Sequence, residues 1–455
     1  MNEVGIGDVI AFSTFHQNLI LLWFLVEVLF FCTVLYIYKQ QLRPLTKPPS
    51  TTNNFKQESI DNVIRHIDCL RKFGYNSDDF FRFFLGAEPA DVRRGNMRAF
   101  LSWAMCSCSY EHADTNTRLM IENHIDTFAR KFGYKSLEKE GYNHDVKHVN
   151  FTLQPDIPFL HRPLIIYIFS GLIEMISNMI YTMHGFQRLS LPNTGMKYWY
   201  KPSSSTLNDQ QLNDKERVNN YPLLFMHGIS LGYLGYYKLI TALGKGREIV
   251  LVDFDHIKVC NFTALSNAPP SPQHYSICVK RILMLHGINR VSLVGHSFGT
   301  ITATWFITNY PDQVAHLTLL DPVCILLGLP DVAVNMLYRK PSNLIEFLIR
   351  HLAAMDITVS YTLYRHFFWN LNLFCIEKHL PKNCNAIIGL SENDEILNAQ
   401  NSYAYTNFCK ENMSSTNNIE VVLWKKFSHA QIMLSPNQHK PLYHLLRRNE
   451  SFVMS

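Results

Sequence analysis

The spacing of hydrophobic positions changes near residue 196. After it, short apolar runs such as PLLFMHG (222–228), EIVLVDF (248–254) and VSLVGHS (291–297) alternate with longer segments compatible with helices. Fully buried strands separated by helical crossovers are typical of a mostly parallel sheet with helices on both faces. Further strands are predicted at 196–202, 317–323, 386–391 and 421–427. We therefore expect an α/β domain over residues 196–455, interrupted by a flexible polar insertion at 203–220.

The N-terminal part begins with the apolar segment 18–38, NLILLWFLVEVLFFCTVLYIY, whose one charge is Glu27. This segment is long enough to cross a hydrocarbon core of ~30 Å at ~1.5 Å per residue. Glu3 and Asp8 precede it, and the basic residues Lys39, Arg43, Lys47 and Lys56 follow it. By the positive-inside rule, residues 1–45 predict a single-pass anchor in the endoplasmic reticulum or another endomembrane, with the bulk of the protein, including residues 196–455, in the cytosol.

Residues 46–190 predict a helical region that contains a second apolar stretch, 163–181. Its apolar residues recur at helical spacing, and its polar residues share another face. The apolar set is Ile165, Phe169, Leu172, Ile176 and Met179, and the polar set is Ser170, Glu174, Ser177 and Asn178. Such a two-sided pattern favours an amphipathic helix that lies on the membrane or docks on the core over a second span.

Composition narrows the possible functions. The chain is 47% hydrophobic and 17% charged, and its net charge of +5 (42 minus 37) is scattered, which does not suggest a nucleic-acid partner. The ten cysteines form no CxxC…CxxC pattern, and no HExxH is present, so we expect neither a metal site nor a cofactor. The oligomeric state is left open.

The motif LVGHSFGT (293–300) supplies a candidate nucleophile. Ser297 follows a predicted buried strand and precedes a plausible helix at 300–310. A sharp strand-to-helix turn with small flanking residues exposes a serine Oγ at the edge of a sheet. The free N–H groups of the helix start can stabilise an oxyanion. We expect the N–H of Phe298 and that of Ile229, after His227-Gly228, to form this oxyanion hole.

A serine hydroxyl needs an imidazole base, and the imidazole needs a carboxylate. Asp394 follows the strand at 386–391, and His429 follows the strand at 421–427. Asp321, at the end of another strand, is an alternative acid. The remaining histidines lack a preceding strand, among them His351, His366 and His439, and His227 is interpreted as structural.

Taken together, LLFMHGIS, LVGHSFG, LSENDEIL and FSHAQ make residues 196–455 resemble the α/β-hydrolase superfamily. LLDPVCILLGLPDVAVNMLYRKP and RHFFWN (365–370) are similar to membrane-anchored eukaryotic α/β-hydrolase-domain proteins. The resemblance implies the α/β-hydrolase fold, with Ser297 as nucleophile, Asp394 as acid and His429 as base.

Residues 323–380 form a long insertion between two predicted strands, rich in Leu, Ile, Phe, Tyr and Trp. In this fold, such an insertion caps the active site, and an apolar cap beside a membrane anchor suits a lipid-like ester. The same aromatic residues are equally consistent with simple packing of the cap. The prediction is a serine hydrolase of small-molecule or lipid esters. An acyltransferase with the same triad and an inactive membrane scaffold remain open, whereas the HxxxxD match of His351 and Asp356 is interpreted as coincidental.

Overall fold

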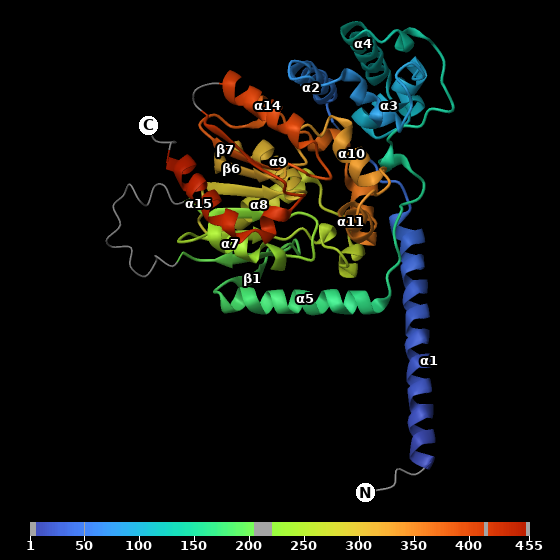
Figure 1. Ribbon diagram of the computed structural model, residues 1–455, viewed down its shortest axis with the longest axis vertical. Coiled ribbons are helices and arrows are strands. Elements are labelled where there is room, and N and C mark those ends of the chain that lie inside the picture. Colours follow the sequence, from blue (N-terminus) through green and yellow to red (C-terminus); the bar gives the residue numbers. More distant parts are fainter. Residues whose placement is uncertain (1–5, 50, 204–220, 414–416, 452–455) are drawn as a thin grey trace.

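An eight-stranded sheet lies at the centre of the computed structural model (Figure 1), which describes residues 6–49, 51–203, 221–413 and 417–451. The strands are β1 (Gln187–Ser190), β2 (Lys197–Lys201), β3 (Leu223–Met226), β4 (Ile249–Val252), β5 (Val291–His296), β6 (Val314–Leu320), β7 (Asn385–Ser391) and β8 (Ile419–Trp424). Their spatial order is β1-β2-β4-β3-β5-β6-β7-β8. Only β2 runs against its neighbours, pairing antiparallel with β1 and β4, and the other pairs are parallel. This confirms the predicted mostly parallel sheet.

All seven strands predicted from the sequence are present. The five central ones, β3 to β7, are buried along their whole length, whereas β2 and β8 are partly exposed. The missed strand, β1, has the sequence QRLS, and its residues are exposed or half-buried at the sheet edge. The predicted polar insertion at 203–220 lies outside the described residues except for Ser203.

Helices cover both faces of the sheet, as predicted. On one face, α7 (Tyr237–Leu243) and α15 (Pro436–Ser451) pack together, and on the other face α8 (Pro272–Leu285) packs on α9 (Gly299–Asn309). Successive strand residues point to opposite faces. Leu223 and Phe225 therefore join the core under α7 and α15, whereas Leu224 and Met226 join the core under α8 and α9.

Three N-terminal helices lie together at the top of Figure 1, on the side of the α/β domain away from β1. They are α2 (Asn53–Arg71), α3 (Arg94–Cys106) and α4 (Thr115–Phe132). Phenylalanine rings fill the space between them, including Phe80, Phe83, Phe84, Phe100 and Phe128. The cluster is continuous with the core of the α/β domain, so this region is attached to the sheet by hydrophobic packing.

The insertion between β6 and β7 is folded into short helices beside the N-terminal region. They are α10 (Pro330–Leu337), α11 (Leu344–Leu348), α12 (Ile357–Tyr361) and α13 (Ile376–His379), and α14 (Ala399–Asn412) follows β7. Phe151, from the N-terminal region, packs on Tyr364 and Phe367 of the insertion. The insertion is therefore held against the body from both sides.

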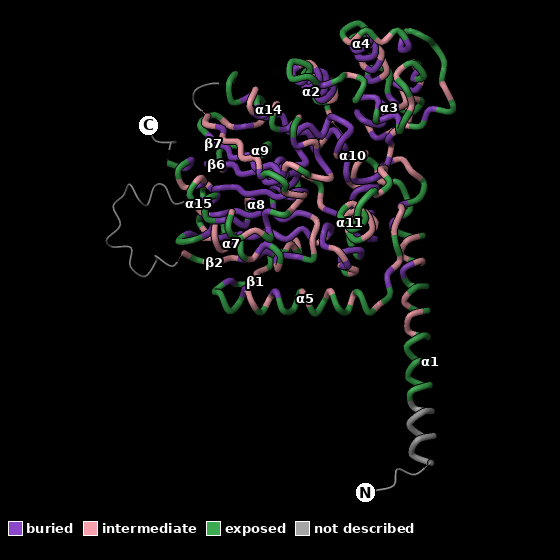
Figure 2. Tube along the Cα trace, viewed as in Figure 1, coloured by how far each residue is buried: buried purple, intermediate pink, exposed green. Residues whose placement is uncertain are grey.

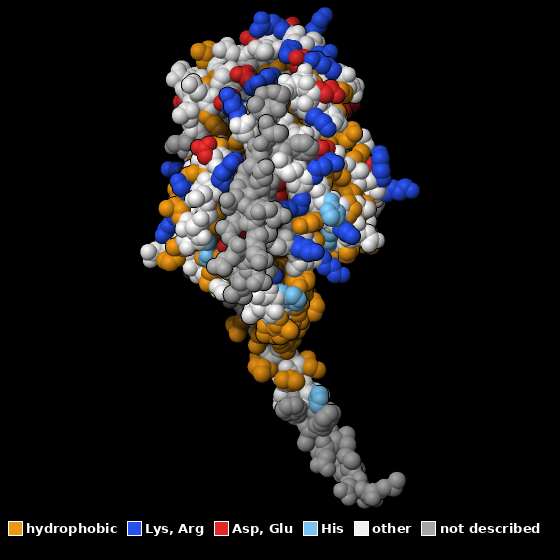
Figure 3. Space-filling model, turned by 90° about the vertical axis from the view of Figure 1, so that its left-hand side faces the viewer, with side chains coloured by type: hydrophobic (Ala, Val, Ile, Leu, Met, Phe, Trp, Pro, Cys, Tyr) orange, Lys and Arg blue, Asp and Glu red, His pale blue; other side chains and the backbone are white. Residues whose placement is uncertain are grey.

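Two helices leave large apolar surfaces uncovered. Helix α1 (Ile6–Ile37) projects away from the body, and α5 (Leu164–Met183) runs crosswise to it beside β1 (Figure 1). Exposed residues recur along α5 and along the part of α1 that is coloured in Figure 2, and hydrophobic side chains surround α1 where it leaves the body in Figure 3. Both are long and apolar enough to cross a membrane. Only 6% of the most apolar stretch of α1 and 11% of that of α5 is buried.

A buried ion pair joins the end of the chain to the sheet. Arg247, just before β4, donates two hydrogen bonds, of 2.7 and 3.1 Å, to the Glu450 carboxylate of α15. Both side chains are fully buried. Two charges removed from water stabilise a fold only while each has its partner.

We expect Glu450→Gln to lower the free energy of unfolding by about 3–5 kcal/mol, because it leaves the Arg247 guanidinium buried without a counter-charge. The measurement is the thermal unfolding midpoint of the full chain in detergent. Glu420→Gln, which removes the partner of the exposed Arg448, is the control and should cost less than about 1 kcal/mol. Equal effects of the two substitutions would contradict this account.

Candidate active site

Ser297 lies in the turn between β5 and α9. Its φ of 52° is in the left-handed region, which costs a residue with a Cβ roughly 1–2 kcal/mol. The neighbouring strand holds this conformation, because the Ser297 N–H donates to the Leu320 carbonyl of β6 at 3.0 Å. The turn therefore brings the serine to the carboxyl edge of the sheet.

Two glycines allow the turn to approach the loop after β3. A Cβ at Gly299 would lie 2.1 Å from the Met226 carbonyl oxygen, and a Cβ at Gly228 would lie 2.8 Å from the Ser297 Cβ. Real Cβ atoms do not come this close to other atoms. Glycine is thus required at both positions, and the loop that carries Ile229 lies directly against the serine turn.

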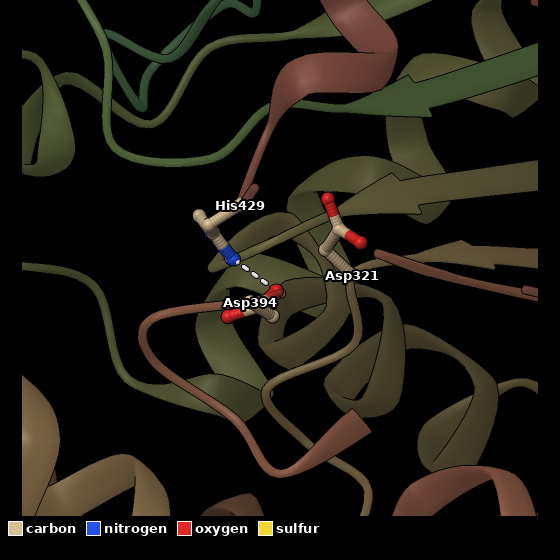
Figure 4. A group of neighbouring side chains, drawn as sticks. All are labelled: Asp321, Asp394 and His429. Atoms are coloured by element: carbon tan, nitrogen blue, oxygen red, sulfur yellow. Dashed lines mark hydrogen bonds and ion pairs between the residues drawn. The ribbon is translucent and has the colours of Figure 1, made fainter. Parts of the chain in front are cut away.

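A chain of two hydrogen bonds starts at the serine. Ser297 Oγ lies 2.8 Å from His429 Nε2, and His429 Nδ1 lies 2.6 Å from Asp394 Oδ2. Figure 4 shows the bond between the imidazole and the Asp394 carboxylate. Because Asp394 is an acceptor, the proton of a neutral His429 resides on Nδ1 and leaves Nε2 free to accept the serine proton.

The loop after β7 orients both partners of this bond. The other oxygen of Asp394 accepts the N–H groups of Ile396 and Leu397 at 2.8 and 3.0 Å. The neighbouring Glu395 accepts the backbone N–H of His429 at 2.9 Å. Backbone donors thus fix the carboxylate, and a second carboxylate fixes the histidine backbone.

Asp321, the alternative acid, has a different environment. One of its oxygens accepts the Ser391 N–H and the other accepts the Ala430 N–H, both at 2.9 Å. Figure 4 accordingly draws its carboxylate near His429 but not bonded to it. Asp321 therefore joins the end of β7 to the residue after the histidine, and Asp394 is the carboxylate that bonds the imidazole.

The carboxylates determine the charge of His429. Burial opposes protonation of the imidazole, but the negative charges of Asp394, Asp321 and Glu395 outweigh it and raise the pKa of His429 to about 9. For Asp321, burial disfavours the ionised form, yet His296, His429 and the Ala430 N–H together hold its pKa below the ordinary value. The site thus stabilises an imidazolium next to Ser297, as proton removal from a serine requires.

The predicted oxyanion donors are two backbone N–H groups, one in the loop after β3 and one next to Ser297 in the chain. Within the described part of the chain, no hydrogen-bond acceptor is assigned to the N–H of Ile229 or of Phe298. Phe298 begins α9, so the helix dipole adds positive potential at its N–H. The N–H groups of Ile229 and Phe298 are thus unengaged, and their role as an oxyanion hole stays a prediction.

His227 shapes the loop that carries Ile229. Its Nε2 accepts the Phe254 N–H at 3.1 Å, so its Nδ1 carries the proton and donates to the Gly228 carbonyl at 2.8 Å. Burial lowers the pKa of His227 to about 4 and keeps it neutral. These bonds agree with the structural role predicted for this residue.

A buried polar chain connects the same loop to Asp321. Gly228 N–H donates to the Tyr236 hydroxyl at 2.9 Å, which frees the hydroxyl proton to bond His296 Nδ1 at 2.9 Å. The proton of His296 then lies on Nε2, 3.8 Å from Asp321. Tyr236 and His296 were not singled out from the sequence, although His296 stands next to Ser297 in the motif.

Aromatic rings cover the serine turn. The Phe298 ring stacks on Phe254 with centroids 6.0 Å apart and meets Phe367, from RHFFWN of the insertion, at 5.9 Å. Ser297 is 8% exposed. The insertion therefore reaches the residue that follows the serine and contributes to the walls around it.

The atoms of Asp321, Asp394 and His429 lie close enough to hold a cation, within 4.8 Å of one another. Their donor atoms are already engaged, because all four carboxylate oxygens and the Nδ1 of the imidazole take part in the hydrogen bonds above. We therefore interpret the cluster as a hydrogen-bonded carboxylate–imidazole unit.

Comparison with known proteins identifies the architecture. Residues 221–416 match the family described as alpha/beta hydrolase fold. No curated protein is significantly similar to the chain.

Similar solved structures include three proteins at low sequence identity. They are a bacterial membrane phospholipase A (15% identity, TM-score 0.42, covering 62% of this chain and 93% of that one), a carboxylesterase of Bacillus subtilis (13%, 0.37, 62% and 98%) and a mutant epoxide hydrolase of Vigna radiata (15%, 0.38, 58% and 98%). At such identities the likeness concerns the fold only.

Asp321→Asn tests the role of the second carboxylate. An amide has one oxygen, so its NH₂ group would face either the Ser391 or the Ala430 N–H, at a cost of about 1–3 kcal/mol. We expect a lower thermal midpoint for the full chain. Asp312→Asn, at a surface turn on the same domain, is the control and should leave the midpoint unchanged. A wild-type midpoint for Asp321→Asn would refute this role.

Proposed function

From this α/β-hydrolase fold and its bonded serine, histidine and aspartate, we propose that the chain is a serine hydrolase that cleaves carboxylic esters through an acyl-enzyme on Ser297. The observation that carries the proposal is the continuous hydrogen-bond chain from Ser297 Oγ through His429 to Asp394. A serine becomes a nucleophile at neutral pH only when an oriented base can take its proton.

In the acylation step, Ser297 Oγ attacks the ester carbonyl carbon while its proton moves to His429 Nε2. The carbonyl oxygen becomes an oxyanion, which the N–H groups of Ile229 and Phe298 stabilise. The intermediate then expels the alcohol, which takes the proton from Nε2, and the acyl group remains on Oγ. Asp394 holds the imidazole in the required tautomer throughout.

In the deacylation step, water takes the place of the alcohol. His429 removes a proton from the water, the resulting hydroxide attacks the acyl carbon, and the second intermediate collapses. The carboxylic acid leaves, and Ser297 Oγ recovers its proton from Nε2. The step returns every group to its starting state, so the site needs no cofactor.

We propose a lipid-like ester as substrate and a single-pass membrane location with the catalytic domain in the cytosol. Support for the location comes from α1, whose residues Leu19–Leu25 are exposed although all seven are apolar. Support for the substrate comes from the apolar insertion, which reaches the serine turn through Phe367 and Phe298.

Ser297 and His429 should act as one unit. Ser297→Ala, His429→Ala and the double variant should fall to a similar residual rate, each losing on the order of 10⁴- to 10⁶-fold in kcat. The assay is hydrolysis of a medium-chain p-nitrophenyl ester by the full chain in detergent, with fluorophosphonate labelling in parallel and circular dichroism as the folding control. Near-wild-type turnover by folded Ser297→Ala would end the hydrolase proposal.

The pH profile reports the charge on His429. Only the neutral imidazole is a base, so kcat/KM should rise with pH, with a midpoint above 6.5 and towards about 9. Asp394→Asn removes a negative charge that favours the imidazolium. It should move the midpoint to lower pH and reduce the maximum of kcat/KM. Asp321→Asn should move the midpoint less. An unshifted midpoint in Asp394→Asn would contradict the assignment of the acid.

A further inference from the structure

Helix α5 packs with its polar side inward. Ser177 and Tyr181 are buried, at 4% and 0% exposure, and both lie on the side of the helix that faces the domain. The opposite side consists of Ile165, Phe169, Leu172, Ile176 and Met179, which are 46–61% exposed. A helix on the surface of a water-soluble domain normally shows the reverse arrangement, so a different environment covers this face.

The inward side of α5 makes specific polar contacts. The Ser170 hydroxyl donates to the Val259 carbonyl, and the Tyr181 hydroxyl donates to the Tyr233 carbonyl at 3.0 Å. Glu174 lies 3.8 Å from the buried ammonium of Lys258. These contacts determine which side of the helix is docked, and they leave the apolar side facing outward along its whole length.

The single charge of the apolar segment connects α1 to α5. Both carboxylate oxygens of Glu27 accept the Leu164 N–H, the first of α5, at 3.1 and 3.0 Å. The N-terminus of a helix attracts negative charge. Glu27 therefore lies where α5 begins, and Figure 1 shows α5 running crosswise to α1.

Helix α1 changes its surroundings at the same residue. Before Glu27, residues 19–25 are exposed on every side of the helix. After it, Val34 is buried, and the Phe30 ring packs on Tyr167 and Phe262 at 5.3 and 5.5 Å. Val28, Leu29 and Tyr36 remain exposed, at 41%, 67% and 65%. The second half of the apolar segment thus packs one side against the folded body, and the first half extends beyond it.

We propose that the bilayer surface runs along α5 and crosses α1 at Glu27, so that α5 lies in the interface with its apolar face in the lipid. The apolar face of α5 is then covered by the same membrane into which α1 inserts. This inference rests on the proposed anchor. Residues 6–26 number 21 and at ~1.5 Å per residue are about 31 Å long, close to a hydrocarbon core of ~30 Å, and their continuously apolar part is residues 19–26. In this placement the inserted part of α1 lies N-terminal to Glu27, whereas the sequence predicts a span at 18–38.

This placement brings the catalytic edge near the lipid. Ser230, directly after the oxyanion residue Ile229, pairs with Lys258, and Val259 donates its N–H to the Ser230 carbonyl at 2.8 Å. Lys258 and Val259 are among the residues that α5 contacts. The interfacial helix and the oxyanion loop are therefore separated by one short segment, which favours substrates drawn from the bilayer.

Photocrosslinking of the full chain in phosphatidylcholine liposomes tests the placement. p-Benzoylphenylalanine replaces Leu172 on the α5 apolar face, Leu22 in the anchor, Tyr36 beyond Glu27 or Leu119 on α4 as a matched exposed control. We expect adducts with acyl chains at positions 172 and 22 and none at 119. Position 36 lies about 13 Å beyond Glu27 along α1 and should also give none. Mass spectrometry identifies the adducts.

Other results would overturn the placement in recognisable ways. Crosslinking of position 172 to a second copy of the chain would assign the apolar face to a dimer. Acyl adducts at position 22 but not at position 172 would agree with the anchor but refute the interfacial placement of α5. Acyl adducts at 36 as abundant as at 22 would return the span to 18–38. Absence of adducts at 22, or release by alkaline carbonate, would refute the anchor itself.

A kinetic comparison separates this inference from the hydrolase proposal. Leu172→Asp with Ile176→Asp should slow hydrolysis of a long-chain ester in vesicles by about tenfold, because two charges oppose insertion of the helix. Hydrolysis of a soluble short-chain ester should stay within about twofold, since neither residue contacts the triad. Equal losses on both substrates, or none on either, would overturn the interfacial role. Inactivity of the wild type would instead reject the hydrolase proposal and leave the crosslinking result unaffected.

Discussion

The close approach of the loop after β3 to the turn after β5 is the constraint on which the rest of the site depends. Met226 and Gly299 approach so closely that no side chain fits between them, and the same is true of Gly228 and Ser297. This contact brings the N–H of Ile229 beside the serine. Ser297 itself has a left-handed conformation, and its Oγ lies 2.8 Å from His429 Nε2. A side chain at Gly228 or Gly299 would push the loop after β3 away from the serine turn.

Buried polar groups around Ser297, His429 and Asp394 connect the contact between these two loops to the loops after β7 and β8. Asp321 connects the end of β7 to the loop of His429, and His296 with Tyr236 connects the serine strand to Gly228. Each group satisfies a backbone N–H or another side chain that would otherwise be buried without a partner. The geometry of the nucleophile and that of the oxyanion loop are therefore not independent of each other.

The sequence predicts the parts of this structure that depend on local pattern. Apolar runs locate seven of the eight strands, and the polar QRLS of β1 does not. Residues that follow strand ends identify Ser297, Asp394 and His429, since parallel strands bring their carboxyl ends to one edge. Roles that depend on contacts between distant segments of the chain cannot be predicted from the sequence. The choice between Asp394 and Asp321 depends on which carboxylate reaches the imidazole, and helical spacing in α5 indicates two faces without indicating which is docked.

The separation of the reactive groups along the chain has a consequence for synthesis. Ser297 and its histidine are 132 residues apart, and β8, which carries the histidine loop, pairs with β7 only after the whole insertion has been made. A ribosome-bound chain that already contains the folded serine turn still lacks its base. In the proposed mechanism, Ser297 therefore acquires its base only when β8, the last strand of the sheet, has been made and paired.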